Sequence, residues 1–359
     1  MRVLDFIHRW TGGLLGLLLA VLGLTGTLMV HKDVWLRATL PHAADRQITD
    51  QAAIAAAVER MLADPLDRPA TIVLASHSLG VHRLVYGPTT GSYNDQAGQV
   101  VARWSSVWGR PEIWVFDLHR HLLAADVGEA VGGVVGLVGL GFVVSGGILW
   151  WRTRRNFKFR LLPKRLSRSS IVRHHRDLGI VVAPLLFLSM LTGSMLALRP
   201  VASLLLRPLS SPTEMAAARA PPAYRSALPP ANLPWRTMLD AARARFPEAE
   251  VRVISLPQKP GDLLAIRLRQ PGEWLPNGGT TVWIDPADAR VVATRDAFEV
   301  PLGLRAFNLA YPAHAAKVGG LAYQLVMTMS GLALTLLGTL AVFSFWVKMV
   351  RLRRTSAQL

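Results

Sequence analysis

Four long apolar segments constrain the fold of this chain more than any other feature of its sequence. They run over Thr11–Val30, Gly128–Trp151, Leu178–Leu198 and Leu321–Val347. A helix of roughly 20 residues crosses the hydrocarbon core of a bilayer, so each segment is long enough to span a membrane. A hydrophobic content of 51% agrees with this length argument. The sequence therefore predicts a membrane protein, mainly α, with four transmembrane helices.

The basic residues indicate how these spans are oriented. Residues 152–176, RTRRNFKFRLLPKRLSRSSIVRHHR, contain no Asp or Glu, and KMVRLRR follows the fourth span. Short loops rich in Lys and Arg stay in the cytoplasm. We therefore expect cytoplasmic termini, a first span within residues 1–31, a basic cytoplasmic loop at 152–177 and a cytoplasmic tail at 348–359. The net charge of +17 then implies contact with membrane lipid and no nucleic-acid partner.

The two long segments between the spans, residues 32–127 and 199–320, then lie outside the cytoplasm. Each opens with a helical pattern, DQAAIAAAVERML or RTMLDAARARF, and continues with short β-rich runs such as VHRLVYG and DLLAIRLRQP. Proline-rich residues 210–230 predict a linker into the second pattern. We expect two outer α+β domains, each with one helix and about three strands. Each belongs to one of two pseudo-repeated halves that read span, outer domain, span. The first half ends with the span at 128–151, and the second half has the spans at 178–198 and 321–347.

A sequence motif is repeated at the start of each half. HRWTGGLLGLLLAVLGLTG, beginning at His8, returns as HRDLGIVVAPLLFLSMLTG, beginning at His175, with the same spacing from His-Arg to Thr-Gly. LHRHLL precedes the second span, and AHAAKVGG precedes the fourth. These motifs occur in the same order in both halves. We interpret the Thr-Gly pair of each repeat as a helix-packing site.

Over nearly the whole chain, these motifs and the two outer patterns resemble the PepSY-associated transmembrane family. Ala289, in the turn DPADAR, stands where that family usually has a glycine. The family includes iron-regulated bacterial inner-membrane proteins and haem-containing reductases of ferric siderophores. The resemblance therefore implies a multi-pass inner-membrane protein with PepSY-like periplasmic domains. It also implies a haem-dependent oxidoreductase that reduces a ferric siderophore in the periplasm.

The residue inventory limits which redox cofactors the chain can carry. It has no cysteine, which excludes iron–sulfur clusters and covalently attached c-type haem. It also shows no GxGxxG nucleotide loop and no evident flavin site. A redox function therefore requires a non-covalent cofactor, and the family resemblance implies haem b. The electron donor would be quinol or a separate cytosolic reductase.

Histidine positions suggest where haem would bind. Neutral imidazoles from two helices can ligate one b-type haem. If the halves are related by an approximate two-fold axis, His8 meets His175 and His119 meets His314. We therefore predict two haems, an inner one on the first pair and an outer one on the second. The remaining candidate ligands are His31, His121 and His174.

Helix phase supports the choice of His8. At about 100° per residue, His8 shares one face of the first span with four glycines. This face forms a groove for either a macrocycle or a neighbouring helix; its glycines are Gly12, Gly16, Gly23 and Gly26. Arg9 and Arg176 directly follow the repeated histidines and are candidates for haem propionate contacts or for membrane-surface anchors.

Two other classes of function compete with the reductase. In the first, a non-enzymatic membrane protein uses PepSY-like domains to bind a periplasmic partner or to modulate a peptidase. In the second, the chain transports a metal or siderophore. The transporter fits less well, because no Asp, Glu, Lys or Arg lies near the centre of a span, where a substrate pathway usually has one.

Overall fold

The computed structural model describes residues 2–64, 66–224, 226 and 233–356, and these form two compact units. The membrane unit contains the chain up to Val30, Val115–Leu204, and the chain from Ala313 onward. The sheet unit contains His31–Trp114 and Leu205–Pro312. The membrane unit thus includes residues 115–127, 199–204 and 313–320 of the predicted outer segments, 32–127 and 199–320.

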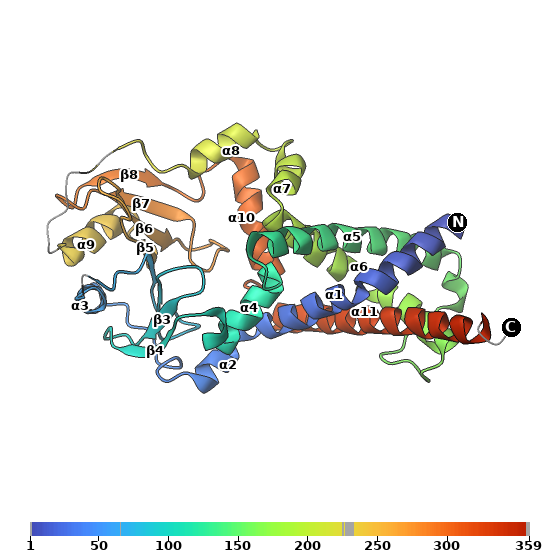
Figure 1. Cartoon of the computed structure of the whole chain (residues 1–359). Coiled ribbons are helices and arrows are strands. Elements are labelled where there is room, and N and C mark those ends of the chain that lie inside the picture. Colours follow the sequence, from blue (N-terminus) through green and yellow to red (C-terminus); the bar gives the residue numbers. More distant parts are fainter. Residues whose placement is uncertain (1, 65, 225, 227–232, 357–359) are drawn as a thin grey trace. The chain divides into compact units, whose positions relative to one another are not determined.

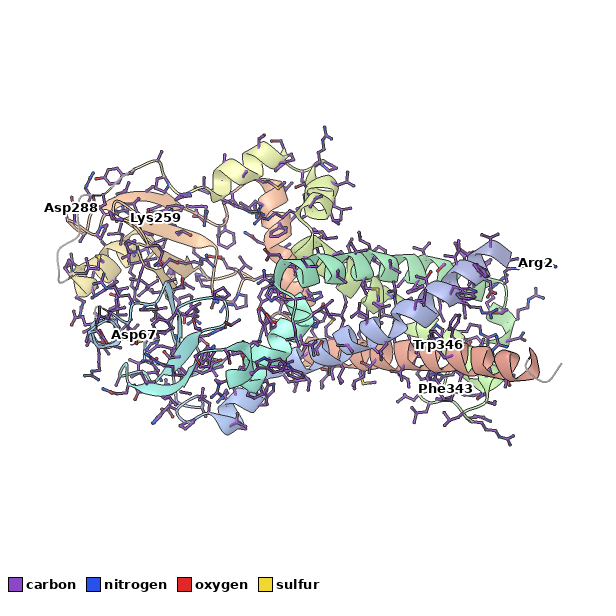
Figure 2. All side chains as sticks on the ribbon, viewed as in Figure 1. Arg2, Asp67, Lys259, Asp288, Phe343 and Trp346 are labelled. Carbon is purple, nitrogen blue, oxygen red and sulfur yellow. The ribbon has the colours of Figure 1, made fainter. Side chains whose placement is uncertain are left out.

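Four long helices build the membrane unit (Figure 1): α1 (Arg2–Val30), α5 (Ala125–Trp151), α6 (Arg168–Ala197) and α11 (Gly320–Ser356). All four are long and apolar enough to cross a membrane, as predicted, so the chain is a multi-pass membrane protein. α6 begins at Arg168 rather than at the predicted residue 178, because the helix continues from the apolar run into the basic segment before it. Figure 2 shows side chains that project from α11, among them the exposed rings of Phe343 and Trp346.

Close backbone contacts hold the helices of the membrane unit together. α1 packs along α11, α5 packs along α6, and the pairs α6–α11 and α1–α5 close the bundle. A Cβ atom added at Gly23 would lie 2.7 Å from the carbonyl oxygen of Gly331, and one at Gly16 would lie 2.9 Å from that of Gly338. Part of the predicted glycine groove on α1 therefore receives a neighbouring helix, the use of small residues typical of membrane interfaces.

Short helices and 3-10 turns connect these elements. They are α2 (Lys32–Thr39), η1 (Val107–Gly109), α4 (Pro111–His121), η2 (Arg154–Asn156), α7 (Arg199–Leu206), α8 (Pro212–Arg219) and α10 (Leu302–His314). α8 lies inside the predicted linker and begins with a capping box between Ser211 and Glu214. Residues 225 and 227–230 of that linker, and residues 357–359 of the predicted tail, lie outside the described residues.

The sheet unit is built on one antiparallel sheet of eight strands, in the order β4-β3-β2-β1-β5-β6-β7-β8. The strands are β1 (Thr71–Val73), β2 (His82–Val85), β3 (Gly91–Asn94), β4 (Val100–Trp104), β5 (Glu250–Ser255), β6 (Leu264–Arg269), β7 (Thr280–Ile284) and β8 (Val291–Arg295). Helices α3 (Gln51–Met61) and α9 (Trp235–Arg245) contribute to the same apolar core.

This arrangement differs from the predicted pair of separate three-stranded domains. Each outer segment supplies one helix and four strands, and β1 pairs with β5 so that Ile72 lies opposite Ile254. Both side chains are fully buried, in a single core to which both segments contribute. Joining the segments in this way covers an otherwise unpaired strand edge in each of them.

Ala289, the residue that departs from the family pattern, has a left-handed backbone. It lies in the turn between β7 and β8 with φ of 60°, and its N–H donates to the carbonyl oxygen of Asp285 at 2.9 Å. This conformation costs a residue with a Cβ atom about 1–2 kcal/mol, which a glycine avoids.

We expect Ala289→Gly to raise the free energy of unfolding by about 1 kcal/mol, because the relieved strain exceeds the added entropy of the unfolded chain. Ala287→Gly, in the same turn and without a positive φ, serves as the control and should lower stability slightly. Thermal melts of the purified full chain measure both effects. Equal melting shifts for the two variants would contradict the assignment.

Candidate functional site

The first candidate site is a pair of histidines on two spanning helices. His8 on α1 and His175 on α6 have ring centroids 6.3 Å apart, with ring planes at 86°. The Ser145 hydroxyl donates to the carbonyl oxygen of Gly141 at 2.6 Å, so it accepts from His8 Nδ1 at 2.7 Å. This bond fixes the proton on Nδ1 and leaves the His8 Nε2 lone pair available to a metal.

The second pair lies on the two short helices that precede α5 and α11. His119 on α4 and His314 on α10 have ring centroids 6.1 Å apart. Burial, with the neighbouring imidazole as a lesser cause, lowers the pKa of His119 to about 4, and burial lowers the pKa of His314. Both rings are therefore neutral at physiological pH, the form in which imidazole binds a metal.

The repeated Thr-Gly motif seats these two rings. The hydroxyl of Thr25 donates to the carbonyl oxygen of Val21 at 2.7 Å and accepts from His119 Nδ1 at 3.0 Å. In the second copy, the hydroxyl of Thr192 donates to the carbonyl oxygen of Leu188 at 2.6 Å and accepts from His314 Nδ1 at 3.1 Å. The same Nδ1 lies 3.0 Å from the carbonyl oxygen of Ser189, a second acceptor. Each threonine thus places the imidazole proton on Nδ1 and leaves Nε2 as the acceptor.

The glycine of each motif makes room for the same ring. A Cβ atom at Gly26 would lie 3.1 Å from His119 Cε1, and one at Gly193 would lie 2.9 Å from His314 Cε1. The Thr-Gly pairs are therefore histidine seats, a role beyond the helix packing predicted from the sequence. The only signal for it was the identical spacing of the two copies, which does not identify the contacting ring.

A cavity of about 550 Å³ opens beside the inner pair and is lined by both His8 and His175. Glycines from all four spanning helices contribute to its wall: Gly12, Gly16, Gly139, Gly146, Gly147, Gly179 and Gly338. No heavy atom lies within 4 Å of a Cβ built at Gly147 or at Gly179, so a side chain at either position would occupy the cavity. The remaining wall is mainly aliphatic and aromatic.

The inner pair and its cavity fit a b-type haem. Two imidazole nitrogens that each bond one metal at about 2 Å place their ring centroids roughly 6 Å apart. His175 Nδ1 is buried and has no hydrogen-bond partner among the described residues. No cluster of three or more His, Asp or Glu in the described part of the chain suits a bare metal ion. A pair of histidines instead suits a metal whose other ligands come from a macrocycle.

Both arginines predicted as propionate contacts line the cavity and already have carboxylate partners. Arg9 lies 3.3 Å from Asp5, and Arg176 lies 2.7 Å from Asp177. A third arginine, Arg168 at the start of α6, lines the cavity and has no carboxylate partner among the described residues. Sequence reasoning missed Arg168, because nothing in the basic segment distinguishes it from its neighbours.

The three remaining candidate ligands, His31, His121 and His174, lie outside both pairs. His121 Nδ1 is 2.7 Å from Asp117, and its Nε2 is 3.9 Å from Glu129. His174 points away from its neighbour His175 and donates from Nε2 to the carbonyl oxygen of Leu161 at 3.0 Å. His31 occupies the turn in front of α2.

The two pairs are separated by the length of the spanning helices. Thr25, which holds His119, follows His8 by 17 residues (25 − 8), and Thr192, which holds His314, follows His175 by 17 residues (192 − 175). This spacing corresponds to roughly 25 Å along each helix. One pair therefore lies toward each end of the bundle.

Comparison with known proteins gives one result for the whole chain. A family model described as the PepSY-associated TM region matches residues 6–348. No curated protein matches the sequence.

Proposed function

Since the chain belongs to the PepSY-associated transmembrane family, we propose that it is a b-type haem protein of the bacterial inner membrane that reduces a ferric complex. Electrons cross the membrane from the cytoplasmic side, and the substrate is a ferric siderophore in the periplasm. The observation that supports this proposal is the presence of two histidine pairs at opposite ends of one four-helix bundle.

Two haems, one on each pair, would supply one-electron iron couples on the two sides of the membrane. His8 and His175 hold the inner iron, while His119 and His314 hold the outer one. Three of these imidazoles, all but that of His175, are oriented through Nδ1 by hydroxyl groups, which raises their basicity as ligands. The hydroxyls belong to Ser145, Thr25 and Thr192. Arg168 is positioned for a propionate group, with Arg9 and Arg176 as additional contacts.

The two ends of the bundle then have different partners. The inner end receives electrons from quinol or from a cytosolic reductase, and the outer end contacts the ferric chelate. Oxygen chelators hold ferrous iron much less tightly than ferric iron, so reduction releases the metal. The PepSY-like sheet unit belongs to the periplasmic side in this proposal.

We also propose that the halves of the membrane unit are related by an approximate two-fold axis. A Cβ atom at Gly331 would collide with Thr27 Oγ1, and one at Gly136 would collide with Ser194 Oγ. Thr27 and Ser194 are 167 positions apart (194 − 27), the same offset that separates His8 from His175 (175 − 8). The matched contacts support the symmetric assignment of the histidine pairs.

The direct test is an optical spectrum of the detergent-purified protein, oxidised and then reduced with dithionite, together with a pyridine haemochrome count. We expect sharp α and β bands and about two b-type haems per chain, as two bis-histidine sites require. A protein without a Soret band after haem-supplemented expression would overturn the proposal. That result would favour the non-enzymatic, partner-binding alternative.

The threonine seats give a second expected result. We expect Thr192→Val to weaken haem binding at the outer pair by about threefold, because His314 Nδ1 loses the threonine hydroxyl and keeps only the carbonyl oxygen of Ser189 as an acceptor. Thr339→Val is the matched control, since the exposed Thr339 hydroxyl bonds only within its own helix, to the carbonyl oxygen of Thr335. Haem titration of the two apo variants measures the difference. Equal haem affinities of the two variants would contradict a role of Thr192 in orienting His314.

A further inference from the structure

The segment between α5 and α6, residues 152–167, combines basic charge with exposed apolar side chains. We call it the basic connection. It contains seven Lys or Arg residues and no Asp or Glu. Among its apolar side chains, Phe159, Leu162 and Leu166 are 52%, 66% and 73% exposed. Its position between two spanning helices places it at the membrane surface, near the end of the bundle where both chain termini lie (Figure 1).

Hydrogen bonds to α6 hold the backbone of the basic connection in place. Asp177 accepts from the backbone N–H of Lys158 at 3.1 Å, and His174 donates to the carbonyl oxygen of Leu161 at 3.0 Å. Both side chains are almost fully buried, at 4% and 3% exposure. A free basic loop would not need buried polar anchors on the adjacent helix. These anchors bond backbone groups of the segment and do not involve its side chains.

Two further bonds fix the ends of the same segment. Arg176 donates from Nη2 to the carbonyl oxygen of Asn156 at 2.9 Å, and the hydroxyl of Ser170 accepts from the backbone N–H of Arg165 at 3.3 Å. The segment is therefore attached to α6 along most of its length, while the charged groups of Lys158, Lys164 and Arg165 stay exposed. None of these three side chains has an acidic partner among the described residues.

We propose that the basic connection is a binding surface for anionic phospholipid on the side of the membrane where the chain termini lie. Guanidinium and ammonium groups bind the lipid phosphates, and the exposed Phe and Leu side chains enter the boundary between headgroups and acyl chains. Anionic lipid attracts basic residues that lie next to a membrane, and the attraction grows with their number. Electroneutral phosphatidylcholine offers no net charge to match this surface. The proposal is independent of haem binding.

The test uses the full chain, stripped of co-purified lipid and titrated with phosphatidylglycerol or phosphatidylcholine in native mass spectrometry. The test variant carries Lys158→Gln, Arg160→Gln, Lys164→Gln and Arg165→Gln. We expect its affinity for phosphatidylglycerol to fall by at least about tenfold and its affinity for phosphatidylcholine to stay unchanged. A matched control removes the same number of charges from exposed positions of the sheet unit: Arg207→Gln, Arg236→Gln, Arg245→Gln and Lys259→Gln.

The control should bind phosphatidylglycerol like the unmodified chain. Equal weakening of both variants would show an effect of net charge alone and would overturn the proposal, as would unchanged binding by the test variant. If the fourfold variant does not elute as a folded protein, Lys158→Gln and Lys164→Gln are measured singly, with an expected loss of about two- to fivefold each. A variant with Lys158→Arg and Lys164→Arg keeps both charges and should bind phosphatidylglycerol like the unmodified chain.

Discussion

His175→Ala is expected to remove haem from the inner pair and leave the outer haem bound, so the haem content falls from about two to about one per chain. Only two side chains hold each iron in this proposal, and no covalent bond retains the macrocycle when one ligand is lost. The pyridine haemochrome count and the amplitude of the reduced α band measure the loss. Retention of the full spectrum would rule out His175 as a ligand.

His174→Ala is the matched control for that measurement. The two histidines are neighbours on α6, but His174 bonds the carbonyl oxygen of Leu161 and lies outside the pair. Its replacement should keep both haems, at some cost in stability from the lost hydrogen bond. Haem loss in both variants to the same extent would indicate a general defect of α6 rather than a missing ligand.

His314→Ala is expected to abolish reduction of the ferric chelate and to leave the inner haem in place and reducible by dithionite. Without the outer haem, no bound redox group lies within roughly 25 Å of the outer end of the bundle. We expect the rate of ferric-siderophore reduction, followed by trapping of ferrous iron, to fall by about a hundredfold or more.

The control for this variant is His121→Ala. His121 lies two residues from His119 and pairs with Asp117 instead of a second histidine. The control should reduce the chelate at close to the unmodified rate. A His314→Ala protein that keeps its reductase rate would place the site of chelate reduction elsewhere in the chain.

The spanning helices were predictable because long apolar segments identify them without any knowledge of tertiary contacts. The two histidine pairs were also expected, from the repeated spacing after His8 and His175 and from the assumption of related halves. In the structure, the ring centroids of the two pairs are 6.3 Å and 6.1 Å apart, close to the separation of two imidazoles that bind one metal. The ligand role itself stays a prediction.

Other features depend on contacts between distant residues, which a single sequence does not encode in a local pattern. The pairing of β1 with β5 joins residues about 180 positions apart, and propensity within each strand gives no information about its partner. The bond from His119 to Thr25 is also long-range, so the Thr-Gly motif resembled ordinary helix packing. Ser145 was missed for the same reason, since its partner His8 lies on another helix.

The pattern of helix contacts has a consequence for how the chain assembles. α1 and α5 precede the basic connection and α6 and α11 follow it, yet the principal contacts are α1 with α11 and α5 with α6. The strand pair β1–β5 also joins one side of the chain to the other. The two parts of the polypeptide therefore relate to each other as the subunits of an obligate dimer do, because each supplies the principal packing partner of the other's helices. A break in the basic connection would leave two complementary fragments, and co-expression of both, rather than of either one, is the condition under which the bundle and the sheet can form.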